Sequence, residues 1–416
     1  MRHIAFLLFL TGAFLSSSYA QTLSLEACLA SARASSPILE QAQYTTLIGI
    51  QEDENLSLQW RPTIGINAQG TYQSDVITFP ENSPLGNLPS LPKAQYRATL
   101  DVQQVLYEGG AIKQSRLLNG MQRNIEVGQA EASLAQVERS ITELYFGVLE
   151  ADEQAKSLLS SVEYLRLRRG NLQAAIRNGV MLSSELARYD QEILRLQQQI
   201  DLLHGQAQAF KAALAVQVGD PDLMSMTLTR PVSAELPNAP RPELELFNLQ
   251  QGLIYAQSDL LDVQKLPKIS AFATGGLGQP NPYNFINTDL SGFYMVGLRL
   301  SWSPFDWGMR EGKQQVLRLK HSMVGQQRSL FELQQNTELA RIDQQILTLS
   351  SFADQDDQLI ALQEEVVARA ESQLDNGTIT TTDYLREVQT LTRNRLSKEL
   401  HGLQLSKLQV QRSQVE

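Results

Sequence analysis

Apolar residues recur every three or four positions along residues 130–176, a stretch that contains no proline. This spacing, close to 3.5 residues, is typical of a helix that packs against other helices along its length. The intervals from Gly110 to Gly179 and from Gly308 to Gly377 each span 69 residues without a proline. At 1.5 Å per residue, each interval predicts a helical rod roughly 100 Å long.

Each rod is predicted to end at an Asn-Gly pair. Asn178-Gly179 and Asn376-Gly377 close the two patterns, and a glycine in the left-handed region commonly ends a helix. Beyond the first pair the apolar spacing restarts in a new phase over residues 186–203. We therefore expect Asn178, Gly179, Asn376 and Gly377 to form the tip turns of two helical hairpins.

Shorter helices complete the predicted helical part. Residues 180–219 and 378–416 are the expected returning arms of the hairpins, and residues 24–60 have a helical pattern broken at Pro37. Pro37 suits the first turn of a helix capped by Ser35 or Ser36. In each half of the chain, two shorter helices are expected to stack end to end beside one long rod.

Four runs between the helices alternate between apolar and polar residues: 62–73, 96–107, 268–278 and 293–303. Such runs of about ten residues are typical of membrane barrel strands, although a soluble antiparallel sheet with one wet face shows the same alternation. Four strands cannot close a membrane barrel, because about eight are needed and open edges leave backbone groups unpaired in lipid. Three copies would supply 12 strands, which predicts a trimeric barrel.

The second half of the chain repeats landmarks of the first. Two prolines recur 205 residues later and two glycines recur 198 residues later, which indicates an internal duplication with one change of loop length. The glycines Gly110 and Gly308 mark the junctions where a strand run gives way to a long helix. The paired landmarks are Pro37 and Pro242, Pro62 and Pro267, Gly110 and Gly308, and Gly179 and Gly377.

The beginning of the chain has the features of a secretory signal. A charged start is followed by a short apolar run at residues 4–15 and by Ser18-x-Ala20, a small-residue cleavage pattern. The run is too short to span a bilayer as a helix. The predicted organisation is a signal peptide (1–20), a first structural repeat (21–219), a proline-rich linker (220–240) and a second structural repeat (241–416).

Composition narrows the possible functions. The net charge of -10 argues against a nucleic-acid partner. The single cysteine, Cys28, excludes an intramolecular disulfide, and we expect it to be a packed residue rather than a lipid-attachment site. The four histidines are scattered, and the sequence has no His-Glu-x-x-His, P-loop or Gly-x-Ser-x-Gly motif. We therefore expect no enzyme activity, no metal site and no cofactor.

Together these features resemble the outer-membrane efflux protein (TolC-like) family over nearly the whole mature chain. The resemblance implies a mainly α-helical mixed fold, with long coiled-coil hairpins and four strands per chain in a 12-stranded transmembrane barrel. It also implies a homotrimer in outer-membrane lipid with a periplasmic helical extension, docked to a periplasmic adaptor and an inner-membrane pump. The residues that carry the resemblance to this family are 23–30, Ser36-Pro37-Ile38-Leu39, 106–110, 304–308, and the tips at 178–185 and 376–385.

The resemblance also implies a periplasmic constriction at the second tip. The family's first acidic residue matches Asp383, whereas its second falls on Arg386, and Glu387 lies one turn beyond Asp383. Three copies of Asp383 would form an acidic ring that favours cations. Asp383 also suits a cap of the returning helix, and the two roles are compatible. Glu185 and Arg188 hold the corresponding positions at the first tip, as candidate ion-pair partners that keep it closed.

The preferred function is a passive exit duct of an efflux or type I secretion system. A soluble periplasmic coiled-coil scaffold or adaptor is the alternative, and an exported enzyme is a third class. An adaptor has one helical hairpin, whereas this sequence has two equal halves, so the adaptor class fits it poorly.

Overall fold

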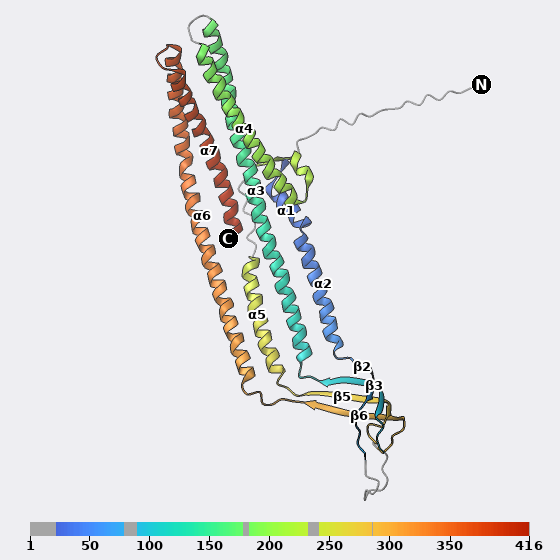
Figure 1. Cartoon of the computed structure of the whole chain (residues 1–416). Coiled ribbons are helices and arrows are strands. Elements are labelled where there is room, and N and C mark those ends of the chain that lie inside the picture. Colours follow the sequence, from blue (N-terminus) through green and yellow to red (C-terminus); the bar gives the residue numbers. More distant parts are fainter. Residues whose placement is uncertain (1–21, 79–89, 178–182, 232–240, 285, 416) are drawn as a thin grey trace, which may run out of the picture. The chain divides into compact units, whose positions relative to one another are not determined.

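The computed structural model describes residues 22–78, 90–177, 183–231, 241–284 and 286–415, and these residues are mainly α-helical with one four-stranded sheet. The elements are drawn in Figure 1. In the first half of the chain they are β1 (Thr22–Leu23), α1 (Leu25–Ser35), α2 (Pro37–Leu58), β2 (Thr63–Tyr72), β3 (Ala94–Tyr107), α3 (Ala111–Arg177) and α4 (Ser183–Val218). They continue as η1 (Pro221–Ser225), β4 (Thr227–Leu228), α5 (Pro242–Val263), β5 (Lys268–Gln279), β6 (Ser291–Ser301), α6 (Met309–Asp375) and α7 (Thr381–Val415).

The chain divides into two compact units. The helical unit comprises residues 1–39, 133–239 and 332–416, and the sheet unit comprises residues 40–132 and 240–331. The long helices α3 and α6, of 67 residues each, contribute to both units. Among the described helices, none combines the length and the apolar character needed to cross a membrane.

Helix α2 begins at the proline that interrupts the early helical pattern. Proline has no backbone N–H to satisfy and its fixed φ suits a first helical turn. The side chain of Ser36 accepts a hydrogen bond from the Ile38 amide at 3.3 Å. Of the two candidate caps, Ser36 is therefore the one that holds this helix start, while Ser35 donates to the Val218 carbonyl at 2.9 Å.

The sheet of the sheet unit is antiparallel throughout, with strand order β2-β3-β5-β6. The sequence-expected runs lie within two residues of the strand ends. Because side chains alternate along each strand, the register gives the sheet one polar and one apolar face. The apolar face is exposed: Ile66 is 82% and Leu298 70% accessible. Its other large exposed side chains include Ile64, Leu100, Tyr294, Val296 and Leu300.

Both long helices are directly preceded by a glycine with positive φ, 94° at Gly110 and 83° at Gly308. A side chain at such a backbone conformation is strained, so glycine is the suitable residue. A carboxylate two positions earlier accepts a hydrogen bond from a first-turn amide: Glu108 from Ile112 at 3.0 Å, and Asp306 from Arg310 at 3.2 Å. These caps satisfy amides that have no partner inside the helix.

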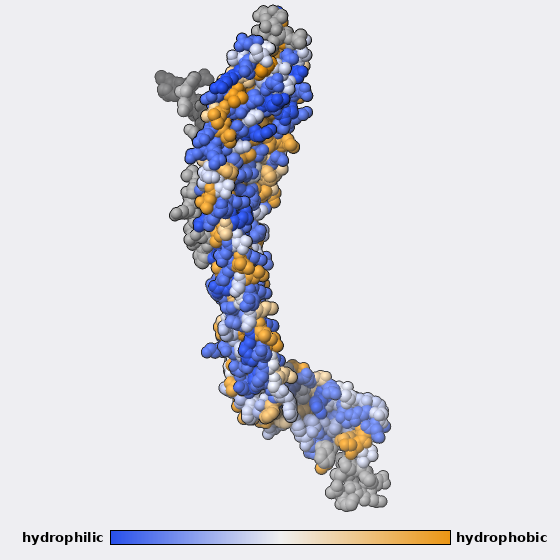
Figure 2. Space-filling model, turned by 90° about the vertical axis from the view of Figure 1, so that its left-hand side faces the viewer, coloured by the Kyte–Doolittle hydropathy of each residue, from blue (hydrophilic) through white to orange (hydrophobic). Residues whose placement is uncertain are grey.

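The helical unit is held by a core to which α3, α4, α6 and α7 all contribute. Buried residues of both hairpins belong to this one core. The outer surface nevertheless keeps many apolar side chains, and Figure 2 shows them interspersed with hydrophilic ones on the face presented. The core residues include Leu158, Val162, Leu165, Tyr189, Ile193, Leu196, Val367, Leu374, Tyr384, Leu385 and Val388.

A second core in the helical unit was not anticipated from the sequence. Segment 220–240 is expected as a plain linker, yet its beginning forms η1 and then β4, which pairs with β1 in parallel. Tyr145 of α3 donates its hydroxyl to the Leu23 and Thr229 carbonyls, at 2.9 and 2.5 Å. Cys28 is fully buried in this core, and burial, followed by Glu26 and Asp220, raises its pKa to about 12.

Candidate functional site

The second tip turn has the geometry of a Schellman motif. Gly377 has a φ of 69°. Its amide donates to the Leu374 carbonyl at 2.9 Å, and the Thr378 amide donates to the Gln373 carbonyl, also at 2.9 Å. The two hydrogen bonds satisfy carbonyls at the end of α6 and reverse the chain. Asn376 binds the Ser372 carbonyl through its side-chain amide at 2.8 Å. Asn178 and Gly179, expected at the first tip, lie outside the described residues.

Asp383 takes part in a capping box at the start of α7. The Thr380 hydroxyl accepts a hydrogen bond from the Asp383 amide at 3.2 Å. In return, the Asp383 carboxylate accepts from the Thr380 amide at 3.3 Å and from its hydroxyl at 2.6 Å. This reciprocal pattern satisfies two donors at a helix start. The cap role anticipated from the sequence is therefore the one the geometry displays.

The cap makes the first turn of α7 sensitive to acid. The Thr380 hydroxyl, then its amide, lower the pKa of Asp383 from its ordinary value. A lowered pKa means that the carboxylate stabilises the folded state fully above about pH 3.9 and loses this effect as the pH falls through the folded-state pKa. We expect Asp383→Ala to lower the hydrogen-exchange protection of residues 381–385 at neutral pH. Acidification of the unsubstituted protein through the folded-state pKa of Asp383 should also lower this protection, measured relative to the intrinsic exchange rate at each pH. Arg386→Gln is the control, because it removes a charge that lies 3.7 Å from the exposed carboxylate and leaves the cap itself in place. Equal protection in the unsubstituted protein, Asp383→Ala and Arg386→Gln at neutral pH would contradict the cap.

The neighbouring residues of α7 have different contacts. Arg386 contacts Asp383 on its own helix and is largely exposed. Glu387 accepts a hydrogen bond from the side chain of Gln363 on α6 at 2.8 Å. The Gln363 side chain also reaches the Glu387 carbonyl at 3.2 Å. Glu387 thus fastens α7 to α6 in this structure.

At the first hairpin, Glu185 and Arg188 form a loose ion pair of 3.7 Å within α4. Arg188 also donates to the hydroxyl of Thr382, in the first turn of α7. The structure thus brings Arg188 together with the turn that carries Asp383. Glu185 keeps its ion pair within the first hairpin.

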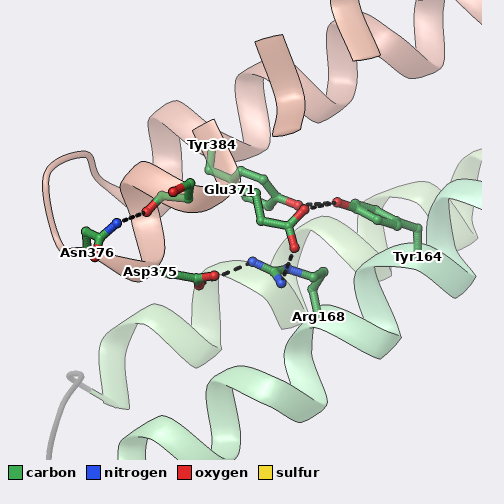
Figure 3. Close-up of polar contacts among 7 residues, drawn as sticks. Tyr164, Arg168, Glu371, Asp375, Asn376 and Tyr384 are labelled. Carbon is green, nitrogen blue, oxygen red and sulfur yellow. Dashed lines mark hydrogen bonds and ion pairs between the residues drawn. The ribbon is translucent and has the colours of Figure 1, made fainter. Parts of the chain in front are cut away.

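A polar cluster between the hairpins was missed by the sequence analysis (Figure 3). Arg168 of α3 binds Glu371 of α6 at 2.5 Å and Asp375 at 3.4 Å. The hydroxyls of Tyr164 and Tyr384 share a hydrogen bond, and the Arg168 guanidinium lies 5.6 Å from the centre of the Tyr384 ring. The cluster joins α3 of the first hairpin to both α6 and α7 of the second.

Burial sets the protonation of this cluster. The Arg168 side chain is only 12% exposed and Tyr384 is fully buried. Burial, then the Tyr164 hydroxyl, raise the pKa of Tyr384, and burial raises the pKa of Tyr189 to about 12. Burial also acts to lower the pKa of Arg168, but Tyr384, Glu371 and Asp375 outweigh it and raise that pKa. The buried Tyr384 is therefore neutral beside a charged arginine.

The signal that could have revealed the cluster is the tyrosine at core spacing. A tyrosine hydroxyl that is buried needs a hydrogen-bond partner, so Tyr164 and Tyr384 at packing positions imply polar neighbours. Arg169, the next residue of the first rod after Arg168, also has a partner. It binds Asp190 of α4 through two hydrogen bonds, of 2.5 and 3.2 Å.

A groove of about 650 Å³ lies beside this cluster, lined by residues of α3, α6 and α7. Four of the charged side chains in its lining form two ion pairs, Arg395 with Glu364 at 2.6 Å and Lys156 with Glu153 at 3.1 Å. Within the described parts of the chain, no three histidine, cysteine, aspartate or glutamate residues are grouped so as to hold a metal ion. The contacts of the tip region are those of helix packing and capping.

Solved structures that share this fold include three bacterial outer-membrane proteins. The outer membrane protein VceC of Vibrio cholerae matches with a TM-score of 0.69 at 15% identity, covering 94% of this chain and 95% of that chain. The CmeC outer membrane channel of Campylobacter jejuni matches at 0.67 and 14%, covering 94% and 85%. The MtrE outer membrane channel of Neisseria gonorrhoeae matches at 0.66 and 14%, covering 94% and 88%.

No protein-family model and no curated protein matches the sequence. The likeness therefore lies in the arrangement of helices and strands over nearly the full length of the chain. The resemblance drawn from the sequence is confirmed at this level: the chain has the fold of the outer-membrane efflux channels.

Proposed function

We propose that the protein is an outer-membrane channel in which three copies complete a 12-stranded barrel. The observation that carries this proposal is a four-stranded sheet with an exposed apolar face and two edge strands, β2 and β6, that have no further partner among the described residues. Open edges and a large apolar face are unfavourable in a soluble monomer. Joining copies edge to edge pairs the backbone groups and places the apolar face in lipid.

In this proposal the helices continue the barrel as a periplasmic tunnel. Several apolar side chains on the outside of α6 are more than half exposed, among them Leu319, Leu333 and Leu347, and neighbouring copies would cover them. The signal-like first 20 residues support export. A periplasmic adaptor and an inner-membrane pump would deliver the cargo of an efflux or type I secretion system, and the channel would conduct it passively.

The two halves, 21–219 and 241–416, are proposed to descend from a duplication. The supporting observation is the match in element length between them. Helices α3 and α6 both have 67 residues, α2 and α5 both have 22, and the returning helices have 36 and 35. A duplicated unit would give the barrel a repeating wall of strand pairs.

The tip region is proposed to be the periplasmic constriction. Three copies of Asp383 around the axis would form an acidic ring with Arg386 and Glu387 beside it, and Glu185 and Arg188 would hold the first hairpin nearby. The capping role of Asp383 leaves its carboxylate exposed, with a side-chain accessibility of 47%. A capped helix start would also fix the position of each charge in the ring.

The channel proposal is tested by the location and mass of the native protein. Membranes of a Gram-negative host expressing the full chain are fractionated, and the detergent extract is run on a gel without heating. We expect the protein in the outer-membrane fraction as a species of about three times the monomer mass, which heating converts to monomer. A periplasmic monomer in plain buffer would overturn the proposal and favour the soluble scaffold.

A further inference from the structure

The polar face of the sheet carries an excess of positive charge in an acidic chain. Its four strands contain three cations, Arg97, Lys268 and Arg299, and one acid, Asp101. Asp101 already accepts three side-chain hydrogen bonds, from Asn67 at 2.8 Å, Thr99 at 2.9 Å and Thr274 at 2.6 Å. Neither Lys268 nor Arg299 has an acidic partner among the described residues. The region around these two cations is therefore electrically unbalanced.

Arg299 is held in place by an aromatic ring. Phe272 of β5 lies opposite Gly297 of β6, and a Cβ atom at position 297 would come within 2.8 Å of the Phe272 ring. The missing side chain lets the ring lie over β6. The Arg299 guanidinium then sits 5.2 Å from the centre of that ring. A guanidinium stacked in this way is pre-oriented while its N–H groups stay available to an acceptor.

The same cation lines a hollow of about 340 Å³ in the sheet unit. Ser270 pairs with Arg299 and Lys268 pairs with Ser301, so the two cations are diagonal neighbours on one face. The one acid in the lining, Glu108, is buried and already caps α3. The hollow thus offers ammonium, guanidinium and hydroxyl donors. Its lining also includes Gln59, Gln103 and Tyr107.

We propose that this hollow binds phosphate or carboxylate groups through Arg299 and Lys268. Guanidinium and ammonium groups beside hydroxyl donors are the usual partners of these anions. The role of this anion site in transport rests on the proposed function. In the proposed channel the polar faces of the sheets line the lumen, and the three hollows would form a cationic band at the helix end of the barrel. Anionic portions of a cargo would bind there before they leave the channel.

The test compares the unsubstituted protein with Arg299→Gln in planar bilayers across a KCl gradient. Arg299→Gln should lower the anion-to-cation permeability ratio by roughly two- to threefold, because three positive charges leave the lumen. Inorganic phosphate added to the bath should lower the same ratio in the unsubstituted channel by occupying the hollow, and should have no further effect on Arg299→Gln.

Arg97→Gln is the matched control, because it removes the same charge from the same face outside the hollow. It should keep the phosphate response. A phosphate response that persists in Arg299→Gln, or that is lost equally in Arg97→Gln, would overturn the inference while leaving the channel intact.

Absence of conductance in the unsubstituted protein would count against the channel instead. The hollow is then tested by melting of the purified full chain: phosphate should raise the Tm of the unsubstituted protein and of Arg97→Gln but not of Arg299→Gln. A Tm that phosphate leaves unchanged in all three proteins would also overturn the inference.

Discussion

Replacing Gly276 with alanine is expected to abolish assembly in the outer membrane. Gly276 lies in β5 opposite Thr99 of β3. A Cβ atom there would be 2.1 Å from the Ala98 carbonyl oxygen and 2.9 Å from the Thr99 Cα. Both contacts are with backbone, so no side chain can move aside and the strands must separate. A strain of about 3 kcal/mol corresponds to roughly a hundredfold loss of correctly paired sheet, at 1.4 kcal/mol per tenfold.

The adjacent glycine provides the control. A Cβ atom on Gly275 would have its nearest neighbours at 3.9 and 4.0 Å, which is ordinary contact. Gly275→Ala should therefore appear in the outer-membrane fraction like the unsubstituted protein, in the heat-sensitive form described above. The expectation for Gly276→Ala fails if both variants yield the same amount of that form in unheated gels.

Tyr384→Ala is expected to produce the largest loss of stability in the helical unit. The ring is fully buried in the core made by both hairpins, and removing a buried aromatic side chain costs about 3–5 kcal/mol because a cavity remains. The substitution also deprives Arg168 of the ring beneath it. Chemical denaturation followed by the helical circular dichroism signal should show this loss as a lower midpoint.

Tyr384→Phe distinguishes the contribution of the buried ring from that of its hydroxyl. It keeps the packing and removes only the hydrogen bond to Tyr164, whose hydroxyl still lies 3.5 Å from Glu371. A loss of about 1 kcal/mol is expected. If the alanine and phenylalanine variants lose equal stability, the cluster is held by its hydrogen bond and the packing argument is wrong.

The main helices could be predicted because their signals are local. An apolar residue every three or four positions, a proline at a first turn and Asn-Gly at a tip each act within a few residues. The pairing of β1 with β4 carries no such signal, since each has two residues. Their position is set by Tyr145, which lies more than 80 residues from both Leu23 and Thr229. Local patterns cannot reveal such contacts.

The candidate site was predictable to a similar extent. The place of Asp383 three residues after Thr380 suggests a capping box, and the structure has one. The partners of Arg168 depend instead on how two helices about 200 residues apart in sequence align. One helical turn of slippage would exchange Glu371 for another residue. The cluster therefore depends on how the two helices are aligned. The apolar pattern is compatible with several alignments and does not select one of them.

The edge strands of the four-stranded sheet have a consequence for the biogenesis of the proposed channel. Among the described residues, the outer edges of β2 and β6 have no partner strand, and such edges are templates for aggregation. In the proposed trimer, a copy on its way to the membrane would need either a holding chaperone or a sheet that forms only as copies meet. In that trimer, folding and assembly would be a single concentration-dependent event.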